Sequence, residues 1–218
     1  MAEHLHRRLH ELKQELLYVG SLVEEGLARS IQALLSRDDR LAQVVIEADR
    51  EIDRMEVEVE HKCLDILALH QPVAHDLRFV VAVLKINNDL ERIGDLAKNI
   101  AKRVIYLSRV PGIEIPCQFQ EMSRIAQRMV KHSLDALVRA DAELARQVLS
   151  EDDSVDTLRD EVSDAVRAEL GQHPEETEIW LKVGSVSRHL ERLADMATHI
   201  AEEVIYMVDG NIVRHRAG

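Results

Sequence analysis

The stretch LERIGDLAKNIAKRVIY, residues 90–106, decides the fold because a near copy of it recurs one hundred residues later. The copy, LERLADMATHIAEEVIY, covers residues 190–206, and ten of its seventeen positions are identical to the first stretch. A second related pair, LAQVVIEADREID at residues 41–53 and LARQVLSEDDSVD at residues 144–156, precedes the two copies. Repetition at one nearly constant spacing indicates two copies of a single structural unit.

Both copies have the spacing of an amphipathic helix, with apolar residues three and four positions apart. The same spacing covers most of the chain, and only 8 glycines and 4 prolines interrupt its 218 residues. Each repeat therefore predicts three helices, with a proline in the first turn of the third one. The six expected helices cover, in order, about residues 5–35, 38–70, 72–107, 119–139, 141–171 and 175–208.

The long break between the expected helices is SRVPGIEIPCQ, residues 108–118, which contains two prolines and a glycine. Proline and glycine at this density are typical of a loop. We therefore predict an all-α fold of two tandem antiparallel three-helix bundles. Residues 1–107 would form the first bundle, residues 108–118 a linker, and residues 119–218 the second bundle.

The composition of the chain argues against several classes of protein. Its net charge is −12, so we expect no direct nucleic-acid binding, which requires a basic surface. No stretch approaches the roughly eighteen apolar residues of a membrane-spanning helix, so we expect no membrane insertion. The N-terminal residues lack the apolar core of a secretion signal, and the two cysteines lack CxxC spacing, which together predict a cytoplasmic protein with reduced thiols.

Each copy of the repeated stretch carries a row of oxygen-bearing side chains four residues apart. In the first copy the row is Glu91, Asp95 and Asn99, and residues at this spacing lie above one another on a helix. The preceding helix carries a similar pair, Asp49 and Asp53. Because the two helices are expected to be antiparallel and rise about 1.5 Å per residue, the two pairs should stand within one helical turn of each other.

The second repeat carries the same arrangement on the two sides of its turn. Its members are Asp152 and Asp156 before the turn, and Glu191, Asp195 and His199 after it. Four carboxylates at one level suit a divalent or trivalent cation, and an imidazole favours iron, zinc or manganese over magnesium. Geometry alone leaves an equal alternative, a solvated acidic face without metal. Helical-wheel angles place the carboxylates of the first repeat, Asp49, Asp53, Glu91 and Asp95, beside the apolar stripe, so we expect no buried catalytic acid with a shifted pKa there.

At these residues the sequence resembles the PhoU family of phosphate-transport regulatory proteins. The resemblance covers nearly the whole chain, and three segments carry it: VVIEADREIDRMEVEV at 44–59, QPVAHDLRFVVAVLKINNDLERIGDLAKNIAKR at 71–103 and HLERLADMATHIAEEVIYMV at 189–208. It implies two three-helix bundles and, as in some members, multinuclear iron or zinc clusters bound through E/DxxxD motifs. These motifs fall on Asp49, Asp53, Glu91 and Asp95 in the first half, and on Asp152, Asp156, Glu191 and Asp195 in the second.

The same resemblance implies a regulatory function without established catalysis. Family members act with the ATPase subunit of the phosphate ABC transporter and with a sensor histidine kinase, and they repress the phosphate-starvation response when phosphate is plentiful. They are cytoplasmic and often form homodimers.

The second half departs from the first in two respects. It lacks the HDLR segment that follows Pro72, and its interval from Pro174 to Glu191 is two residues shorter than the interval from Pro72 to Glu91. We therefore expect either a different metal occupancy in the second repeat or a partner surface on one repeat only.

The sequence thus favours a non-enzymatic adaptor in phosphate regulation, with metal ions that fix adjacent helices. One alternative is a carboxylate-bridged di-metal enzyme, an oxidase or a phosphatase, whose turnover would depend on Glu91 or Glu191. Another is a structural bundle without metal.

Overall fold

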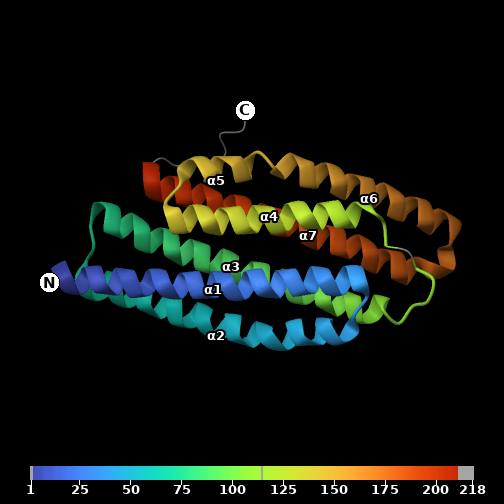
Figure 1. The fold of residues 1–218 in the computed structure, drawn as a ribbon, viewed down its shortest axis with the longest axis horizontal. Helices are drawn as coiled ribbons and strands as arrows, with labels where there is room; N and C mark the ends of the chain where they lie inside the picture. Colours follow the sequence, from blue (N-terminus) through green and yellow to red (C-terminus); the bar gives the residue numbers. More distant parts are fainter. Residues whose placement is uncertain (1, 114, 211–218) are drawn as a thin grey trace.

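The computed structural model describes residues 2–113 and 115–210, and every regular element over these residues is helical (Figure 1). The first bundle consists of α1 (Ala2–Ser36), α2 (Asp39–His70) and α3 (Ala74–Leu107). The second consists of α4 (Gln118–Arg139), α5 (Ala142–Leu149), α6 (Asp152–Gln172), the short 3-10 helix η1 (Pro174–Glu176) and α7 (Thr177–Asp209). None of these helices is long and apolar enough to cross a membrane. The predicted all-α architecture is confirmed.

Both repeats begin their second helix with an aspartate cap. The Asp38 carboxylate accepts hydrogen bonds from the backbone N–H groups of Arg40 and Leu41, each 3.0 Å long. Asp141 accepts the same two bonds at the start of α5, again at 3.0 Å. An N-cap of this kind contributes roughly 0.5–2 kcal/mol. The caps therefore start the second helix at the same point of each repeat.

The helix expected over residues 141–171 is interrupted, and this part of the prediction is wrong. Ser150 and Glu151 separate α5 from α6, which follow each other along one side of the second bundle (Figure 1). The Ser150 hydroxyl donates to the carbonyl of Gln147 at 2.7 Å, a local bond that competes with regular helix. The Glu151 carboxylate accepts from Arg128 of α4 at 2.8 Å. Two aspartates in the first turn of α6 then favour a new helix N-terminus.

The repeated stretch lies at the centre of the molecule. It forms the second half of α3 and of α7, and these two helices pack against each other as well as against their own bundles (Figure 1). The same apolar positions are buried in both copies: Leu90, Ile93, Ala97, Ile100 and Ala101, and Leu190, Leu193, Ala197, Ile200 and Ala201. Burial on both sides explains why this stretch is repeated with so few changes.

The α3–α7 contact has an approximate two-fold symmetry. Lys85 of α3 forms an ion pair with Glu203 of α7, with Nζ 3.2 Å from Oε2. Their counterparts in the other repeat, Ser185 and Arg103, also meet, with Arg103 Nε donating to Ser185 Oγ at 3.0 Å. Each repeat therefore presents the same helix face to the other.

Arg37 fixes the segment between α3 and α4. Its guanidinium donates to the carbonyls of Leu107 at 2.5 Å and Ile113 at 3.0 Å, and also to that of Val110. Arg37 itself has a positive φ of 54°, which lets the chain turn between α1 and α2. One side chain at the first turn of the protein thus holds the end of the first bundle in place.

The two cysteines lie in different environments. Cys63 is buried in α2 and Cys117 is exposed just before α4, and both are free thiols. Burial, with a smaller contribution from Glu60, raises the pKa of the Cys63 thiol to about 12. Cys63 is therefore a neutral part of the core.

Candidate functional site

The first carboxylate cluster lies between α2 and α3. Asp49 and Asp53 belong to α2, Glu91 and Asp95 belong to α3, and the two helices pack against each other. The pKa of Glu91 is raised first by burial and then by the negative charges of Asp95, Asp53, Glu56 and Asp49. The structure therefore brings together the four carboxylates that the register argument paired.

Asp49 lies deeper than the helical-wheel angles predict. It is 5% exposed, and burial raises its pKa, so the expectation that these carboxylates stay beside the core is wrong here. Gly94 faces it from α3, and both residues line a cavity of about 40 Å³. A Cβ atom at Gly94 would lie 3.1 Å from Ile52 Cδ1 but 3.6 Å from Asp49 Oδ1, an ordinary contact. The missing side chain therefore makes room for Ile52, the neighbour of Asp49 on the same helix face.

Lys98 joins the two sides of the first cluster. Its Nζ lies 2.5 Å from Asp95 Oδ1 and forms a second ion pair with Asp49 Oδ2. Burial lowers the pKa of Lys98, but the hydrogen bonds to Asp49 and Asp95 outweigh it and raise the pKa overall. The sequence pattern did not single out Lys98. The signal was its position three residues after Asp95, on the side of α3 that faces α2.

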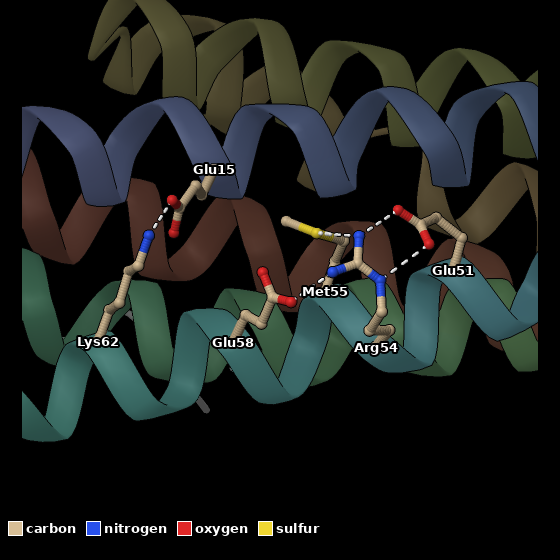
Figure 2. Close-up of polar contacts among 6 residues, drawn as sticks. All are labelled: Glu15, Glu51, Arg54, Met55, Glu58 and Lys62. Atoms are coloured by element: carbon tan, nitrogen blue, oxygen red, sulfur yellow. Dashed lines mark hydrogen bonds and ion pairs between the residues drawn. The ribbon is translucent and has the colours of Figure 1, made fainter.

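Other acidic residues of α2 are neutralised by their neighbours on the surface (Figure 2). Arg54 donates to Glu51 through two nitrogens, at 3.0 and 2.5 Å, and forms an ion pair with Glu58. Lys62 forms an ion pair with Glu15 of α1. The hydrogen bond from Arg54 lowers the pKa of Glu51, whereas the pKa of Glu91 in the cluster is raised. The pKa of a clustered carboxylate is thus shifted in the opposite direction from that of Glu51, a surface acid of α2.

The second carboxylate cluster lies between α6 and α7. Asp152 and Asp156 belong to the start of α6, and Glu191 and Asp195 belong to α7. Burial, followed by the charges of Asp195, Asp156 and Asp153, raises the pKa of Asp152 to about 6. The mutual repulsion shows that these carboxylates also lie close together.

Among the described residues, no lysine joins the two sides of the second cluster. Thr198 occupies the position of Lys98, and its hydroxyl donates to the backbone carbonyl of Asp195 at 2.7 Å. Arg159 of α6 lies beside the cluster, with Nη2 3.6 Å from Asp156 Oδ1. Its charge lowers the pKa of Glu191, but burial and the neighbouring carboxylates keep that pKa raised. The second cluster therefore retains more uncompensated negative charge than the first.

His199 connects the second cluster to the other bundle. Its Nδ1 lies 3.9 Å from Oδ1 of Asp89, a buried residue of α3. The interaction with Asp89 is the largest cause of the raised pKa of His199, opposed by burial and supported by the charges of Glu202 and Asp195. A carboxylate behind an imidazole is the usual support of a metal-bound histidine. Asp89 was not among the predicted site residues.

The first repeat has no equivalent of this pair. Asn99 takes the place of His199 and is partly buried on α3. His189 takes the place of Asp89, and neither of its ring nitrogens has a hydrogen-bond partner within the described residues. Burial and the charges of Arg103, Arg192 and Arg188 lower the pKa of His189 to about 4. In this counterpart pair the imidazole of His189 therefore takes the place of the carboxylate, and it stays neutral.

The donor atoms of the second cluster fit a cation, because four carboxylates supply negative charge there and the His199 imidazole, when neutral, supplies a nitrogen lone pair. In residues 2–113 and 115–210 no three His, Cys, Asp or Glu side chains already converge closely enough to hold an ion. Binding would therefore require the side chains to turn inward. The first cluster fits less well, because Lys98 supplies a positive charge between its two helices.

Comparison with known proteins gives a consistent result along the whole chain. The family model described as the PhoU domain matches twice, at residues 16–104 and 119–204. The chain is 36% identical to the phosphate-specific transport system accessory protein PhoU homolog of Aquifex aeolicus, over 97% of this chain and 96% of that one. It is 37% identical to the homolog of Pseudomonas aeruginosa, over 99% of this chain and 89% of the other.

Two solved structures show the same fold. The crystal structure of PhoU from Pseudomonas aeruginosa superimposes with a TM-score of 0.90 at 36% identity, covering 94% of this chain and 99% of that one. The phosphate transport system regulatory protein PhoU from Streptococcus pneumoniae superimposes with a TM-score of 0.89 at 29% identity, covering 96% and 99%.

Proposed function

The chain belongs to the PhoU family, and from this premise we propose that it regulates phosphate uptake and the phosphate-starvation response without catalysing a reaction. The observation that carries the proposal is the match of both repeats to the PhoU domain, together with relatives named as accessory proteins of phosphate transport. In a bacterial host that lacks its own PhoU protein, expression of this chain should restore repression of a phosphate-starvation reporter at high phosphate. Unchanged reporter activity would contradict the proposal.

The proposed partners are the ATPase subunit of the phosphate ABC transporter and a sensor histidine kinase, and the place of action is the cytoplasm. A surface that suits a protein partner lies at the turn between α2 and α3, where Leu69 is 71% and Val73 is 76% exposed. Leu77, one turn into α3, extends this apolar surface. The equivalent turn of the second repeat carries Glu175 and Glu176 instead. The apolar surface therefore belongs to one repeat only.

A pull-down of the ATPase subunit and of the kinase's cytoplasmic part tests both partners. Val73→Asp should abolish capture of the partner that contacts the α2–α3 turn. Val57→Asp is the matched control, because Val57 is an exposed valine in the middle of α2, away from that turn. Capture of neither partner by the unchanged chain would count against the adaptor function, and equal loss in both variants would count against this surface. Sedimentation of the purified chain tests the proposed homodimer.

Metal binding is the second part of the proposal. Asp152, Asp156, Glu191, Asp195 and His199 would hold iron, zinc or manganese ions, including a multinuclear group. A bound ion would neutralise the mutual repulsion that raises the pKa of Asp152 and would fix α6 against α7. Elemental analysis of protein purified without chelator should find at least one ion per chain. Less metal than this, even after incubation with each of the three metals, would contradict this part alone.

The regulatory proposal differs in one measurable respect from a carboxylate-bridged oxidase or phosphatase. A di-metal enzyme would lose turnover in Glu191→Gln, whereas a regulator would lose bound metal and reporter repression with no turnover to lose. Assays for hydrolysis of phosphate esters and for oxygen consumption, with the metal-loaded chain, separate the two.

A further inference from the structure

We propose that Lys98 is a resident cation of the first carboxylate cluster, and that it confines metal binding in this chain to the second repeat. This inference rests on the metal-binding part of the proposed function.

The position of the ammonium group is the first step. Lys98 Nζ contacts Asp49 Oδ2 on α2 and Asp95 Oδ1 on α3, so it connects the same two helices that a bridging ion would connect. A metal ion placed between these two carboxylates would stand at the position that Nζ occupies. At a few ångströms two like charges repel each other, more strongly near a protein surface than in water, and a divalent ion doubles the repulsion.

The burial of the group is the second step. The Lys98 side chain is 20% exposed and the Asp49 side chain 6%. If the ammonium swung away, Asp49 would remain as a buried carboxylate whose nearest charged neighbours, Asp53 and Asp95, are also negative. Breaking a buried pair by removing one partner is strongly unfavourable. Lys98 is therefore held in place, and a metal ion would have to displace it against both effects.

The comparison of the repeats is the third step. Thr198 stands at the equivalent position, carries no charge and directs its hydroxyl to the backbone of its own helix. Arg159 forms ion pairs with Asp156 and Asp160, all three on α6. Its charge also acts on Glu191 and Asp195 of α7, but within the described residues it forms no ion pair that connects α6 to α7. The two clusters share their carboxylates and differ in whether a cation already bridges the helices.

The test uses the full chain, stripped with chelator and then loaded with Mn²⁺, an ion that prefers oxygen ligands. The measurement is manganese bound per chain after desalting, supported by the rise in unfolding temperature on adding Mn²⁺. The exchange variants are Lys98→Thr and Thr198→Lys, each of which gives one cluster the residue of the other. Lys98→Arg keeps the charge and serves as the control.

Lys98→Thr should roughly double the manganese bound per chain, and the added metal should disappear when Glu91→Gln is combined with it. Thr198→Lys should reduce binding to near zero. Lys98→Arg should bind as much as the unchanged chain. Unchanged binding in Lys98→Thr would overturn the inference, and so would loss of metal from the otherwise unchanged chain on Asp53→Asn, because the first cluster would then already be occupied.

The outcomes separate this inference from the proposed metal binding. If the unchanged chain binds no manganese but Lys98→Thr does, Lys98 is the blocking cation and the second cluster is not a metal site. If neither binds, both statements fail. If Lys98→Thr does not fold, as circular dichroism would show, Thr198→Lys decides alone: retained manganese would overturn the blocking role of a lysine at this position.

Discussion

Lys85 of α3 and Glu203 of α7 form an ion pair at 3.2 Å that joins the two bundles, and Glu203 is only 2% exposed. Lys85 also lies over the ring of Tyr206, 5.7 Å from its centroid. The symmetry-related contact, from Arg103 to Ser185, has no buried carboxylate. The two related contacts between the bundles thus use equivalent positions of α3 and α7, but only one of them contains an ion pair with a buried carboxylate.

Replacement of Lys85 by methionine should destabilise the protein by about 1–3 kcal/mol, because the buried Glu203 carboxylate loses one of the groups that compensate it. The double variant Lys85→Met with Glu203→Met should recover part of this loss, since it removes the buried charge as well. Urea unfolding followed by circular dichroism measures both. Single and double variants as stable as the unchanged chain would show that the pair is not important for docking of the bundles.

Asp152→Asn should stabilise the metal-free protein at neutral pH and have little effect in acid. The native pKa of Asp152 is about 6 and its ordinary value 3.8, so between these values the folded chain holds a proton that the unfolded chain has lost. The contribution of this group to stability is therefore present below about pH 4 and is lost as the pH rises through about 6.

With allowance for solvent screening of a half-buried group, we expect a gain of about 1 kcal/mol, or roughly 2–4 °C in Tm, above pH 7. Asp153→Asn is the matched control, because it lies in the same first turn of α6 and loses the same helix-dipole interaction. Thermal unfolding in chelator at several pH values measures the difference. A gain that persisted at pH values below about 4 would contradict this explanation.

Two glycine-to-alanine changes should have opposite signs. Gly26→Ala in α1 should stabilise by roughly 0.5–1 kcal/mol, because an added Cβ would meet nothing within 4 Å and alanine favours helix. Gly94→Ala should destabilise by about 1–2 kcal/mol, because its Cβ would lie 3.1 and 3.3 Å from two atoms of Ile52. Equal effects in urea unfolding would mean that the close approach of Ile52 to Gly94 does not limit packing there.

Arg37→Ala should destabilise the end of the first bundle by about 2–4 kcal/mol, because three backbone carbonyls lose a charged donor. Hydrogen exchange should become faster in the segment that follows α3. Arg37→Gly loses the same bonds but relieves the positive φ of 54°, so it should be more stable than Arg37→Ala by roughly 1 kcal/mol. The difference between the two variants separates the backbone effect from the side-chain effect.

Much of the fold could be predicted from the sequence because the signal is periodic and repeated. The apolar spacing of residues 90–106 and 190–206 indicated the central helices, and the capping aspartates lie where the second helices were expected to begin. The interruption after α5 could not be predicted in this way. It depends on a serine that bonds back to its own turn and on the contact of Glu151 with α4, which is a tertiary interaction.

The carboxylate clusters could be predicted as groups, since register along antiparallel helices depends only on rise per residue. Their electrostatics could not. Asp49 is buried where α2 packs against Gly94 of α3, and a helical wheel of α2 alone does not include the neighbouring helix. Lys98 and Asp89 lie outside the E/DxxxD motif. Their roles depend on tertiary contacts, because Lys98 reaches the carboxylates of the first cluster and Asp89 lies beside His199 of the second.

The contrast between the two cysteines provides a way to follow these experiments. Cys117 is exposed, whereas Cys63 is buried with a thiol pKa of about 12. A maleimide dye should therefore label the native chain once, next to the α3–α4 segment, and label it twice only after unfolding. The second labelling event counts unfolded molecules directly, so a single reagent can rank the stability of all the variants above in one gel or mass spectrum.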